Sequence, residues 1–363
     1  MDVAHEGSNL LLVTIIPDFR EEGWHSMDLN SDMLIANHSG TFRFQVAQPK
    51  FSKVFGRLPI KFFRNIDRFY NRFVSYPSYL KKMDTKSGFF HLVDHSYSHL
   101  LHYLPGERTG VYCHDLDAFR CILEPSEEKR PAWFVKMTRH IFSGFLKARV
   151  VFCNSQITRE NILRLNHWKF EDVHLVPPGI CDEFVADGPA ESGEYLLHVG
   201  SCIPRKRIDV LLNVFGKVSQ RYPSLKLIQA GGTFTKVQEN QIYYLGIRDK
   251  VEQRKGLSRE DLAKLYRGAK CLLITSDSEG FGLPSIEAIK CGCPVISNSL
   301  PSVEEAVGNC ARYASNQDLD KWVFEINSQL GVGAENEVVI PEHIDHFTWA
   351  SYAAKISNVY RGL

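Results

Sequence analysis

The stretch that most constrains the fold is residues 271–297, CLLITSDSEGFGLPSIEAIKCGCPVIS. It begins with an apolar run without alternation, which is typical of a strand buried on both faces of a parallel sheet. Two glycines follow in Glu279-Gly-Phe-Gly282, and they allow unusual backbone angles and close approach of a ligand. Pro284 suits the first turn of a helix, because a proline lacks the N–H that would be unpaired there. We expect this helix to run until Gly292 and a second strand to follow it.

The predicted turn places the positive end and the free N–H groups of a helix beyond the carboxyl ends of the strands. An anion, most often a phosphate, is expected there. Glu279 lies just before the helix and Glu287 lies one to two turns inside it, and carboxylates accept hydrogen bonds from hydroxyl groups. Two acids beside an anion site indicate a phosphorylated ligand with hydroxyls on both sides, such as a nucleotide sugar. An ordinary βαβ unit with two solvated glutamates explains the spacing equally well.

The segment Glu279-Gly-Phe-Gly-Leu-Pro-Ser-Ile-Glu287-Ala resembles the Glu-x7-Glu signature of the retaining "group 1" glycosyltransferases, which are similar to glycosyltransferase family 4. Other segments follow in the order and spacing of that family: Cys153–Thr158, Val176–Ile180, His198–Asp209, Leu257–Leu262 and Phe347–Trp349. The resemblance is continuous over the second half of the chain and patchy over the first. It implies the GT-B architecture, an α/β fold of two Rossmann-like doubly wound parallel-sheet domains facing a cleft, with a C-terminal helix that crosses back to the first domain.

The alternation of strands and helices occurs twice along the chain, as two doubly wound domains require. A chain of 363 residues can form two domains with a core each, and residues 177–193 have the Pro/Gly density of a linker. We therefore expect a first domain at residues 1–188, a second at 189–346 and a returning helix at 347–363. The resemblance assigns acceptor binding to the first domain and the nucleotide-sugar donor to the second.

Composition excludes several classes of protein. With 44% hydrophobic residues, 23% charged residues and a net charge of +1, the chain is typical of soluble globular proteins, and nucleic-acid binding is not expected. The nine cysteines are an odd number without a paired framework, which indicates reduced thiols in a cytosol. Neither a signal peptide nor a transmembrane helix is predicted. We therefore expect a cytoplasmic protein.

Three consecutive cations, Arg205 to Arg207, follow the first strand of the second domain. They are either solvated surface or a clamp on a diphosphate. By resemblance, Lys206 corresponds to the phosphate lysine of the family, and Ser201 stands where an arginine is usual, so the second cation is assigned to Arg205. The resemblance also implies that His114 touches the donor sugar, Glu279 its hydroxyls and Glu287 the ribose. The predicted catalytic residues are His114, Arg205, Lys206 and Glu279; the predicted donor-binding residues are Gly23, Ser201, Arg254, Leu257, Gly280, Phe281, Gly282, Leu283 and Glu287.

The predicted acceptor-binding residues lie in the first domain, where strand ends face the cleft: Trp24, His95, Tyr97 and Asp115. His91, His95 and His99 recur at four-residue intervals, which on a helix would align them as metal ligands. The apolar run around Leu92 favours a strand instead, on which the three cannot converge. We predict no metal site, and the resemblance implies catalysis without a metal or another cofactor.

The segment from Lys50 to Lys82 is rich in aromatic and basic residues, and its helical spacing predicts one basic face and one apolar face. The basic face carries Lys61, Arg64, Arg68 and Arg72, and the other carries Phe62, Ile66, Phe69 and Phe73. We favour a domain helix with buried phenylalanines and solvated charges. The alternative is a surface that contacts anionic headgroups or a lipid-pyrophosphate acceptor, which would place the protein at the inner face of the cytoplasmic membrane.

Together these observations predict a retaining glycosyltransferase that moves a hexose from a UDP- or GDP-sugar to a hydroxyl of a glycan, lipid-linked or small-molecule acceptor. Its expected role is the synthesis of cell-surface polysaccharide or of another glycoconjugate. Two alternatives use the same shape. A nucleotide-sugar epimerase would isomerise the donor without an acceptor, and a nucleotide-sugar-binding protein would not react at all.

Overall fold

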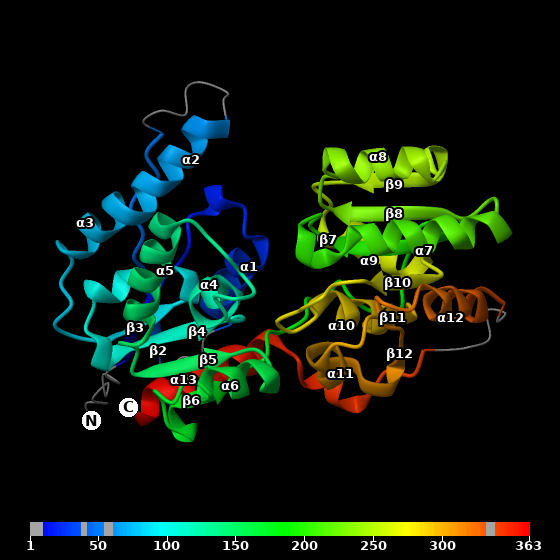
Figure 1. Cartoon of the computed structure of the whole chain (residues 1–363). Helices are drawn as coiled ribbons and strands as arrows, with labels where there is room; N and C mark the ends of the chain where they lie inside the picture. The colour runs from blue at the N-terminus through cyan, green and yellow to red at the C-terminus, as the bar shows by residue number, and fades with distance from the viewer. Residues whose placement is uncertain (1–9, 38–41, 54–60, 332–337) are drawn as a thin grey trace, which may run out of the picture. The chain divides into compact units, whose positions relative to one another are not determined.

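The computed structural model describes residues 10–37, 42–53, 61–331 and 338–363. The chain divides into two compact units (Figure 1). Unit 1 consists of the residues up to Gly179 together with Trp349–Leu363, and unit 2 is Ile180–Thr348. The chain therefore leaves unit 1 once and returns to it at its C-terminal end.

Within the described residues, unit 1 has one parallel sheet of six strands in the order β2-β1-β3-β4-β5-β6. Every residue of β4 and β5 is buried, as expected for short apolar strands that are covered on both faces. The strands are β1 (Leu11–Ile16), β2 (Phe42–Val46), β3 (Phe89–Leu92), β4 (Thr109–Cys113), β5 (Val150–Cys153) and β6 (Val173–Leu175).

The order of these strands creates a switch point. Because β2 and β3 flank β1 on opposite sides, successive connections run in opposite directions across the sheet. Ligands of doubly wound sheets bind beyond the carboxyl ends of the strands at such a point. In unit 1 this position is occupied by the loops that follow β1 and β3.

Helices cover both faces of this sheet. The helix α6 begins where Ser155 accepts a hydrogen bond from the Thr158 N–H at 3.3 Å, which satisfies a free donor of the first turn. The helices are α1 (His25–Ala36), α2 (Lys61–Tyr70), α3 (Tyr76–Leu80), α4 (Arg120–Leu123), α5 (Ala132–Phe145), α6 (Gln156–Leu163) and α13 (Trp349–Gly362), with a π-helical turn η2 (Asn71–Ser75) between α2 and α3 and 3-10 turns η1 (Arg20–Glu22), η3 (His95–His102), η4 (Gly106–Arg108), η5 (Asp117–Phe119) and η6 (Phe170–Asp172).

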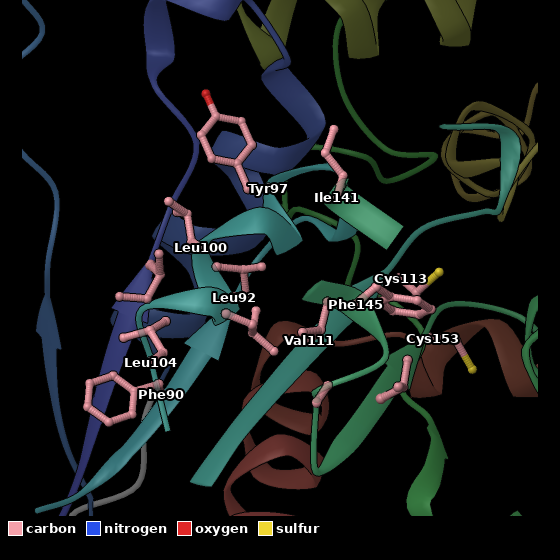
Figure 2. Packing of buried hydrophobic residues seen from close by; sticks show 14 of the residues in the cluster. Phe90, Leu92, Tyr97, Leu100, Leu104, Val111, Cys113, Ile141, Phe145 and Cys153 are labelled. Atoms are coloured by element: carbon pink, nitrogen blue, oxygen red, sulfur yellow. The ribbon is translucent and has the colours of Figure 1, made fainter. Parts of the chain in front are cut away.

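The core of unit 1 fills the space between the sheet and the elements η3 and α5. Figure 2 shows Leu92 from β3 and Val111 from β4 near Leu100 of η3 and Phe145 of α5. All four side chains are fully buried. The loops at the carboxyl edge of the sheet therefore rest on a closely packed base.

The C-terminal helix α13 is part of unit 1. The Tyr360 hydroxyl donates to the Phe90 carbonyl at 3.0 Å and lies 2.9 Å from His91 Nδ1. Gly110 of β4 leaves room for this hydroxyl, because a Cβ at that position would overlap it. The predicted fold with a returning C-terminal helix is confirmed.

The predicted amphipathic helix agrees in part with the interpretation that we favoured, since Phe73 packs against the core of unit 1 and Arg64 is exposed. Its residues 54–60 lie outside the described part of the chain. Arg68 donates to the carbonyl oxygens of Glu21 and Glu22 at 2.8 and 3.1 Å, and Arg72 donates to the Ser96 carbonyl. Phe69, in contrast, is 54% exposed. Arg68 and Arg72 thus face the protein, where their guanidinium groups bind loop carbonyls.

Unit 2, in its described part, has a second parallel sheet of six strands in the order β12-β11-β10-β7-β8-β9. Its strands are β7 (Tyr195–Gly200), β8 (Lys226–Gly231), β9 (Val251–Arg254), β10 (Cys271–Ile274), β11 (Val295–Ser297) and β12 (Ala311–Tyr313). Its helices are α7 (Ile208–Arg221), α8 (Lys236–Tyr244), α9 (Arg259–Gly268), α10 (Leu283–Lys290), α11 (Pro301–Val307) and α12 (Leu319–Gly331), with 3-10 turns η7 (Pro204–Lys206), η8 (Arg248–Lys250), η9 (Gly308–Cys310) and η10 (Glu342–His346). The core under α7 and α12 is built from Leu211, Phe215, Leu227, Leu273 and Trp322.

None of the described helices is both long and apolar enough to cross a membrane. All nine cysteines are free thiols, and eight of them are buried. The expectation of reduced cysteines agrees with this arrangement.

Candidate active site

The switch point of unit 2 lies between β7 and β10, because β8 and β10 flank β7 on opposite sides. The loop after β7 carries Arg205 and Lys206 within η7, and the loop after β10 carries Glu279. The two strands are parallel neighbours, with Leu197 paired to Leu272. Their carboxyl ends therefore meet at one edge of the sheet, where a ligand of a doubly wound fold is expected.

Hydrogen bonds join these two loops directly. The Thr275 hydroxyl donates to the Lys206 carbonyl at 2.9 Å, and the Asp277 N–H donates to the Arg205 carbonyl at 2.8 Å. The backbone that carries both cations is thus fixed to the end of β10. The two cations are positioned by the sheet itself rather than by a free loop.

Glu279 contacts both cations. Its Oε1 accepts from Lys206 Nζ at 2.5 Å and from the Ser276 hydroxyl at 2.5 Å, while its Oε2 lies 3.3 Å from Arg205 Nη1. The Lys206 and Glu279 side chains are 11% and 10% exposed. Burial acts to raise the pKa of Glu279, but the charges of Lys206 and Arg205 outweigh burial and hold that pKa below its ordinary value. Glu279 is therefore a carboxylate at neutral pH.

The third cation of the run is held elsewhere. Arg207 pairs with Asp209 at 2.9 Å and with Asp277 at 3.1 Å. Its backbone lies in the left-handed region, with φ of 47°. Arg207 is thereby directed to two surface carboxylates, so that Arg205 and Lys206 alone of the three contact Glu279.

The turn from Gly280 to Leu283 leads from Glu279 into α10. Gly282 has φ of 79°, and a Cβ there would lie 3.0 Å from Val303 Cγ2, so this position requires glycine. The Phe281 side chain is buried and packs edge-to-face on Phe347 with ring centroids 5.2 Å apart. The turn therefore offers backbone groups, not the Phe281 ring, beside Glu279 and the positive end of α10.

Glu287 lies within α10 and is bound to Tyr266 of α9. The Tyr266 hydroxyl donates to Glu287 Oε2 at 2.9 Å. Burial raises the pKa of Glu287 to about 7, although this hydrogen bond and the charge of Arg259 act to lower it. The carboxyl group thus changes charge near neutral pH, whereas Glu279 does not.

The other predicted donor residues are more dispersed. Ser201 is exposed in the loop after β7, and Leu257 is half-buried between β9 and α9. Arg254, the last residue of β9, pairs with Glu252 at 2.7 Å and with Glu191 at 3.2 Å. The structure brings Arg205, Lys206 and Glu279 into contact and ties Arg254 to two different acids.

Three residues that hold this cluster were not predicted as site residues. Tyr266 binds Glu287, Ser276 binds Glu279, and the Ser302 hydroxyl donates to the Glu279 carbonyl at 2.7 Å. Ser276 was visible as a polar residue at the end of a predicted strand. Tyr266 and Ser302 come from α9 and α11, and only the three-dimensional fold brings them to the two glutamates.

His198 lies beneath the cation loop, in β7, and is 2% exposed. Burial and the neighbouring charge of Lys206 lower the pKa of His198 to about 3, against the charge of Glu279, which raises it. The ring is therefore neutral at physiological pH. It adds no positive charge beneath Lys206.

The remaining predicted residues belong to unit 1. His114 follows β4 and is buried, with its Nε2 2.9 Å from the Val93 carbonyl. His95 begins η3, and its Nε2 lies 4.0 Å from Asp115 Oδ1. Burial lowers the pKa of His114, while for His95 the Asp94 carboxylate outweighs burial and raises the pKa.

Gly23, Trp24 and Tyr97 meet at the loop after β1. The Tyr97 hydroxyl donates to Glu22 Oε1 at 2.7 Å, and Trp24 Nε1 lies 3.2 Å from Glu22 Oε2. Gly23 has φ of 76° with no atom within 4 Å of a built Cβ, and the Trp24 ring is 53% exposed. Of the predicted acceptor residues, Trp24 is thus exposed near Glu22, whereas the Tyr97 side chain is fully buried.

The described part of the chain contains no group of three or more His, Cys, Asp or Glu side chains arranged to hold a metal ion. His91 lies in β3, whereas His95 and His99 lie in η3. Their regular spacing in the sequence therefore does not align them on one face.

Solved structures share this fold over nearly the whole chain. A lipopolysaccharide outer core galactosyltransferase in its apo form aligns with a TM-score of 0.63 and 16% identity, over 97% of this chain and 99% of that one. An Anabaena protein solved in complex with UDP and glucose aligns with a TM-score of 0.70 and 15% identity, over 97% and 100% of the two chains. Sucrose-phosphate synthase from Thermosynechococcus elongatus aligns with a TM-score of 0.66 and 18% identity, over 97% and 98%. The fold is therefore the GT-B fold of glycosyltransferases.

The family can be stated more closely. Residues 182–327 match the family model described as glycosyl transferases group 1. O-antigen chain mannosyltransferase B of Escherichia coli is 25% identical over 293 residues, which are 71% of this chain and 72% of the relative. MMP alpha-(1->4)-mannosyltransferase of Mycolicibacterium hassiacum is 29% identical over 204 residues, 52% of this chain and 48% of the relative. The chain thus spans most of the first relative and about half of the second, and the resemblance found in the sequence is confirmed.

Proposed function

We propose that this protein is a retaining glycosyltransferase that transfers a hexose from a UDP- or GDP-sugar to a hydroxyl group of an acceptor. The observation that carries the proposal is the contact of Lys206 and Arg205 with Glu279 beside the start of α10. Cations and a helix N-terminus suit a diphosphate, and a carboxylate suits sugar hydroxyls. Their combination fits a sugar that is joined to a diphosphate.

The two cations supply the stabilisation that glycosyl transfer needs. As the bond to the donor phosphate breaks, the sugar becomes oxocarbenium-like and the diphosphate gains negative charge. Lys206 and Arg205 are fixed by loop hydrogen bonds before the reaction, so little reorganisation opposes them. Fixed cations that face a growing negative charge stabilise the transition state more than the bound substrate.

Glu279 has two roles in this proposal. Without a donor, it holds both cations at the edge of the sheet. With a donor bound, the diphosphate competes for the cations, and the carboxylate accepts hydrogen bonds from hydroxyls of the donor sugar. The low pKa of Glu279 keeps it a pure acceptor across neutral pH.

Glu287 is the proposed ribose ligand. It lies inside α10, whereas Glu279 lies in the loop before that helix, and its Oε2 is already oriented by Tyr266 at 2.9 Å. Its other oxygen accepts ribose hydroxyls when the carboxyl is ionised. Its raised pKa of about 7 then makes donor affinity dependent on pH.

Retention of anomeric configuration follows, in this proposal, from attack on the face that the diphosphate leaves, with the leaving phosphate taking the proton of the acceptor. His114 is the proposed contact to the donor sugar from unit 1. We propose that no metal is needed, because Arg205, Lys206 and the start of α10 provide the positive charge.

The proposed acceptor is a glycan or a lipid-linked or small-molecule hydroxyl compound, in the synthesis of cell-surface polysaccharide or another glycoconjugate. The names of the relatives support this class, since one acts on an O-antigen chain and another on a lipopolysaccharide core. We also propose a cytoplasmic location with peripheral membrane contact. The exposed Phe69 and Val74, 54% and 44% accessible, support such contact.

The test begins with melting temperatures of the purified protein in the presence of UDP, GDP, ADP and their common sugar conjugates, with EDTA present. A ligand that binds only the folded state raises the melting temperature with the logarithm of its concentration over Kd. We expect a rise with UDP or GDP and with one of its sugars. Transfer assays with that sugar and NMR of the product then report the anomeric configuration.

The other outcomes distinguish the alternatives. Isomerised donor without acceptor would indicate an epimerase, and tight binding without any turnover would indicate a binding protein. No shift with any nucleotide, or dependence of the shift on added metal, would contradict the proposed donor site. Lys206→Ala should remove the shift, whereas Lys217→Ala, at an exposed pair with Asp320, should preserve it.

A further inference from the structure

A second group of buried charged residues lies at the switch point of unit 1. Asp18 follows β1 and Asp94 follows β3, the neighbouring strands between which the connections change direction. The two residues are 2% and 5% exposed. Neither carboxyl group takes part in the donor site of unit 2.

Asp94 is surrounded by donors. It accepts a hydrogen bond from the Ser96 N–H at 2.9 Å and another from the Ser96 hydroxyl. Its Oδ1 also lies 3.2 Å from His95 Nδ1. These contacts favour the ionised carboxylate and hold its pKa below the ordinary range although burial opposes ionisation.

Asp18 has the opposite environment. Among the residues that the structure describes, no donor group reaches either of its carboxyl oxygens. Asp18 and Asp94 each lie two residues beyond the paired residues Ile16 and Leu92 of neighbouring parallel strands, which brings the two loops side by side. Burial, the negative charge of Asp94 and a hydrogen bond to it raise the pKa of Asp18 well above the ordinary value. Two buried carboxyl groups in contact cannot both be ionised without a large cost, so one proton between them is the stable arrangement.

The surrounding charges fit a single proton on the pair. Arg72 lies 3.5 Å from Glu22, and both face Asp18 together with the buried Tyr76. With Asp18 neutral, the cluster contains the carboxylates of Asp94 and Glu22 beside Arg72 and His95, and Asp115 and His114 border it. An ionised Asp18 would add a further negative charge to the interior.

We propose that Asp18 and Asp94 share one proton and act as positioning residues that lock the loop after β1 to the start of η3, where the acceptor hydroxyl compound binds. This inference rests on the proposed function for its catalytic consequence. Each carboxyl group of this hydrogen bond belongs to a different loop. Asp18 lies in the loop after β1, which continues to Gly23 and Trp24. Asp94 lies at the start of η3 and orients the ring of His95.

Further contacts fix the two ends of this link. Gln48 Nε2 donates to the Asp18 carbonyl at 2.7 Å, and the Tyr76 hydroxyl lies 3.0 Å from the Pro17 carbonyl. On the other side, Asp94 is the N-terminal cap of η3. The shared proton is therefore one side-chain link between two backbone segments that are each already anchored, and it adds to the hydrogen bond from the Tyr97 hydroxyl to Glu22.

The protonation is tested first on the native protein. With 13C placed in the aspartate carboxyl groups, NMR titration should show one carboxyl that stays protonated through neutral pH, and Asp18→Asn should remove that resonance. Absence of a protonated aspartate at neutral pH would overturn the proposal.

Melting temperature gives an independent test of the same state. Unfolded Asp18 ionises at about its ordinary pKa of 3.9, and the folded pKa is higher, so the stability associated with Asp18 is lost as pH rises between the two values. Asparagine cannot ionise but can still donate to Asp94. Asp18→Asn should therefore melt no lower than wild type at neutral pH, with an advantage that grows as pH rises. A lower melting temperature, or failure to fold, would contradict a neutral Asp18.

The positioning role is tested by kinetics. Asp18→Asn should keep the acceptor KM within about twofold, because the amide preserves the link, whereas Asp94→Asn should raise it about tenfold, as expected for a lost charged hydrogen bond. The donor KM and nucleotide binding should stay unchanged in both variants, and the exposed Asp84→Asn should behave as wild type. Equal effects of the two variants on acceptor KM would overturn the positioning role. If the protein transfers no sugar, the NMR and melting results still decide the shared proton.

Discussion

Replacement of Lys206 by alanine is the most informative perturbation of the donor site. Lys206 Nζ lies 2.5 Å from Glu279 in an 11% exposed position, and its backbone is fixed by Thr275. In the proposed mechanism its charge meets the leaving diphosphate. Loss of one preorganised group of this kind lowers kcat by about 100- to 1000-fold, or about 2.7–4 kcal/mol. Because Arg205 remains beside Glu279, we expect the lower end of that range.

The same change alters the folded state in a defined direction. Glu279 loses the cation at its Oε1 but retains Ser276 and Arg205. The pKa of Glu279 is depressed in the folded protein, so its stabilising effect is present above the unfolded pKa and is lost as pH falls through the folded one. Lys206→Ala should leave the pKa of Glu279 less depressed, so the stability difference between wild type and variant should be largest at neutral pH and should shrink as pH falls.

The assay is the initial rate of nucleotide release from the donor that is identified by melting-temperature shifts. Measurements at saturating donor separate kcat from KM, and binding of the free nucleoside reports whether the base site is intact. Lys206→Arg and Lys217→Ala serve as the charge-preserving and surface controls. A kcat within about twofold of wild type, in a folded Lys206→Ala protein, would refute the assignment of Lys206 to the leaving group.

Three further predictions concern other positions. Glu287→Gln should raise the donor KM about tenfold or more at pH 8, as expected for the loss of a charged hydrogen bond. The donor KM of the wild type should rise as pH falls below the Glu287 pKa of about 7. Kinetics at several pH values should show that the variant lacks this dependence. Gly282→Ala should destabilise the protein by about 1–2 kcal/mol, since φ is 79° and the new Cβ meets Val303; denaturant unfolding measures this, and an unchanged midpoint would exclude strain at the turn. Tyr360→Phe should lower the free energy of unfolding by about 1–3 kcal/mol, because the Phe90 carbonyl loses a buried donor. Denaturant unfolding measures this change. If the variant also loses the rise in melting temperature with nucleotide, the effect is not local to unit 1.

The sequence predicted the elements around the donor site closely. The apolar run before Glu279 is β10, Pro284 lies in the first turn of α10, and Gly282 has the positive φ that two glycines suggested. Local chemistry determines these features, so neighbouring residues were sufficient. The run of cations was also visible, and its position after β7 followed from the alternation of strands and helices.

Side-chain partners from distant segments could not be predicted in the same way. Arg207 resembles Lys206 in the sequence, yet it pairs with Asp209 and Asp277. Tyr266 reaches Glu287 from another helix. The orientation of the helix at α2 was predicted only in part, because periodicity separates two faces without stating which one meets the protein, and the loop carbonyls that bind Arg68 are not encoded locally.

The return of α13 to unit 1 has a consequence for the order of folding during synthesis. N-terminal domains usually fold first as a chain emerges from the ribosome. Here the strands β3 and β4 gain their contact with Tyr360 only after α13 has been synthesised, because the Tyr360 hydroxyl occupies the space beside Gly110. Unit 2 can be complete while unit 1 still exposes the apolar surface that α13 covers. A released chain that is truncated before residue 349 should therefore contain all of unit 2, while its unit 1 lacks the helix that covers this apolar surface.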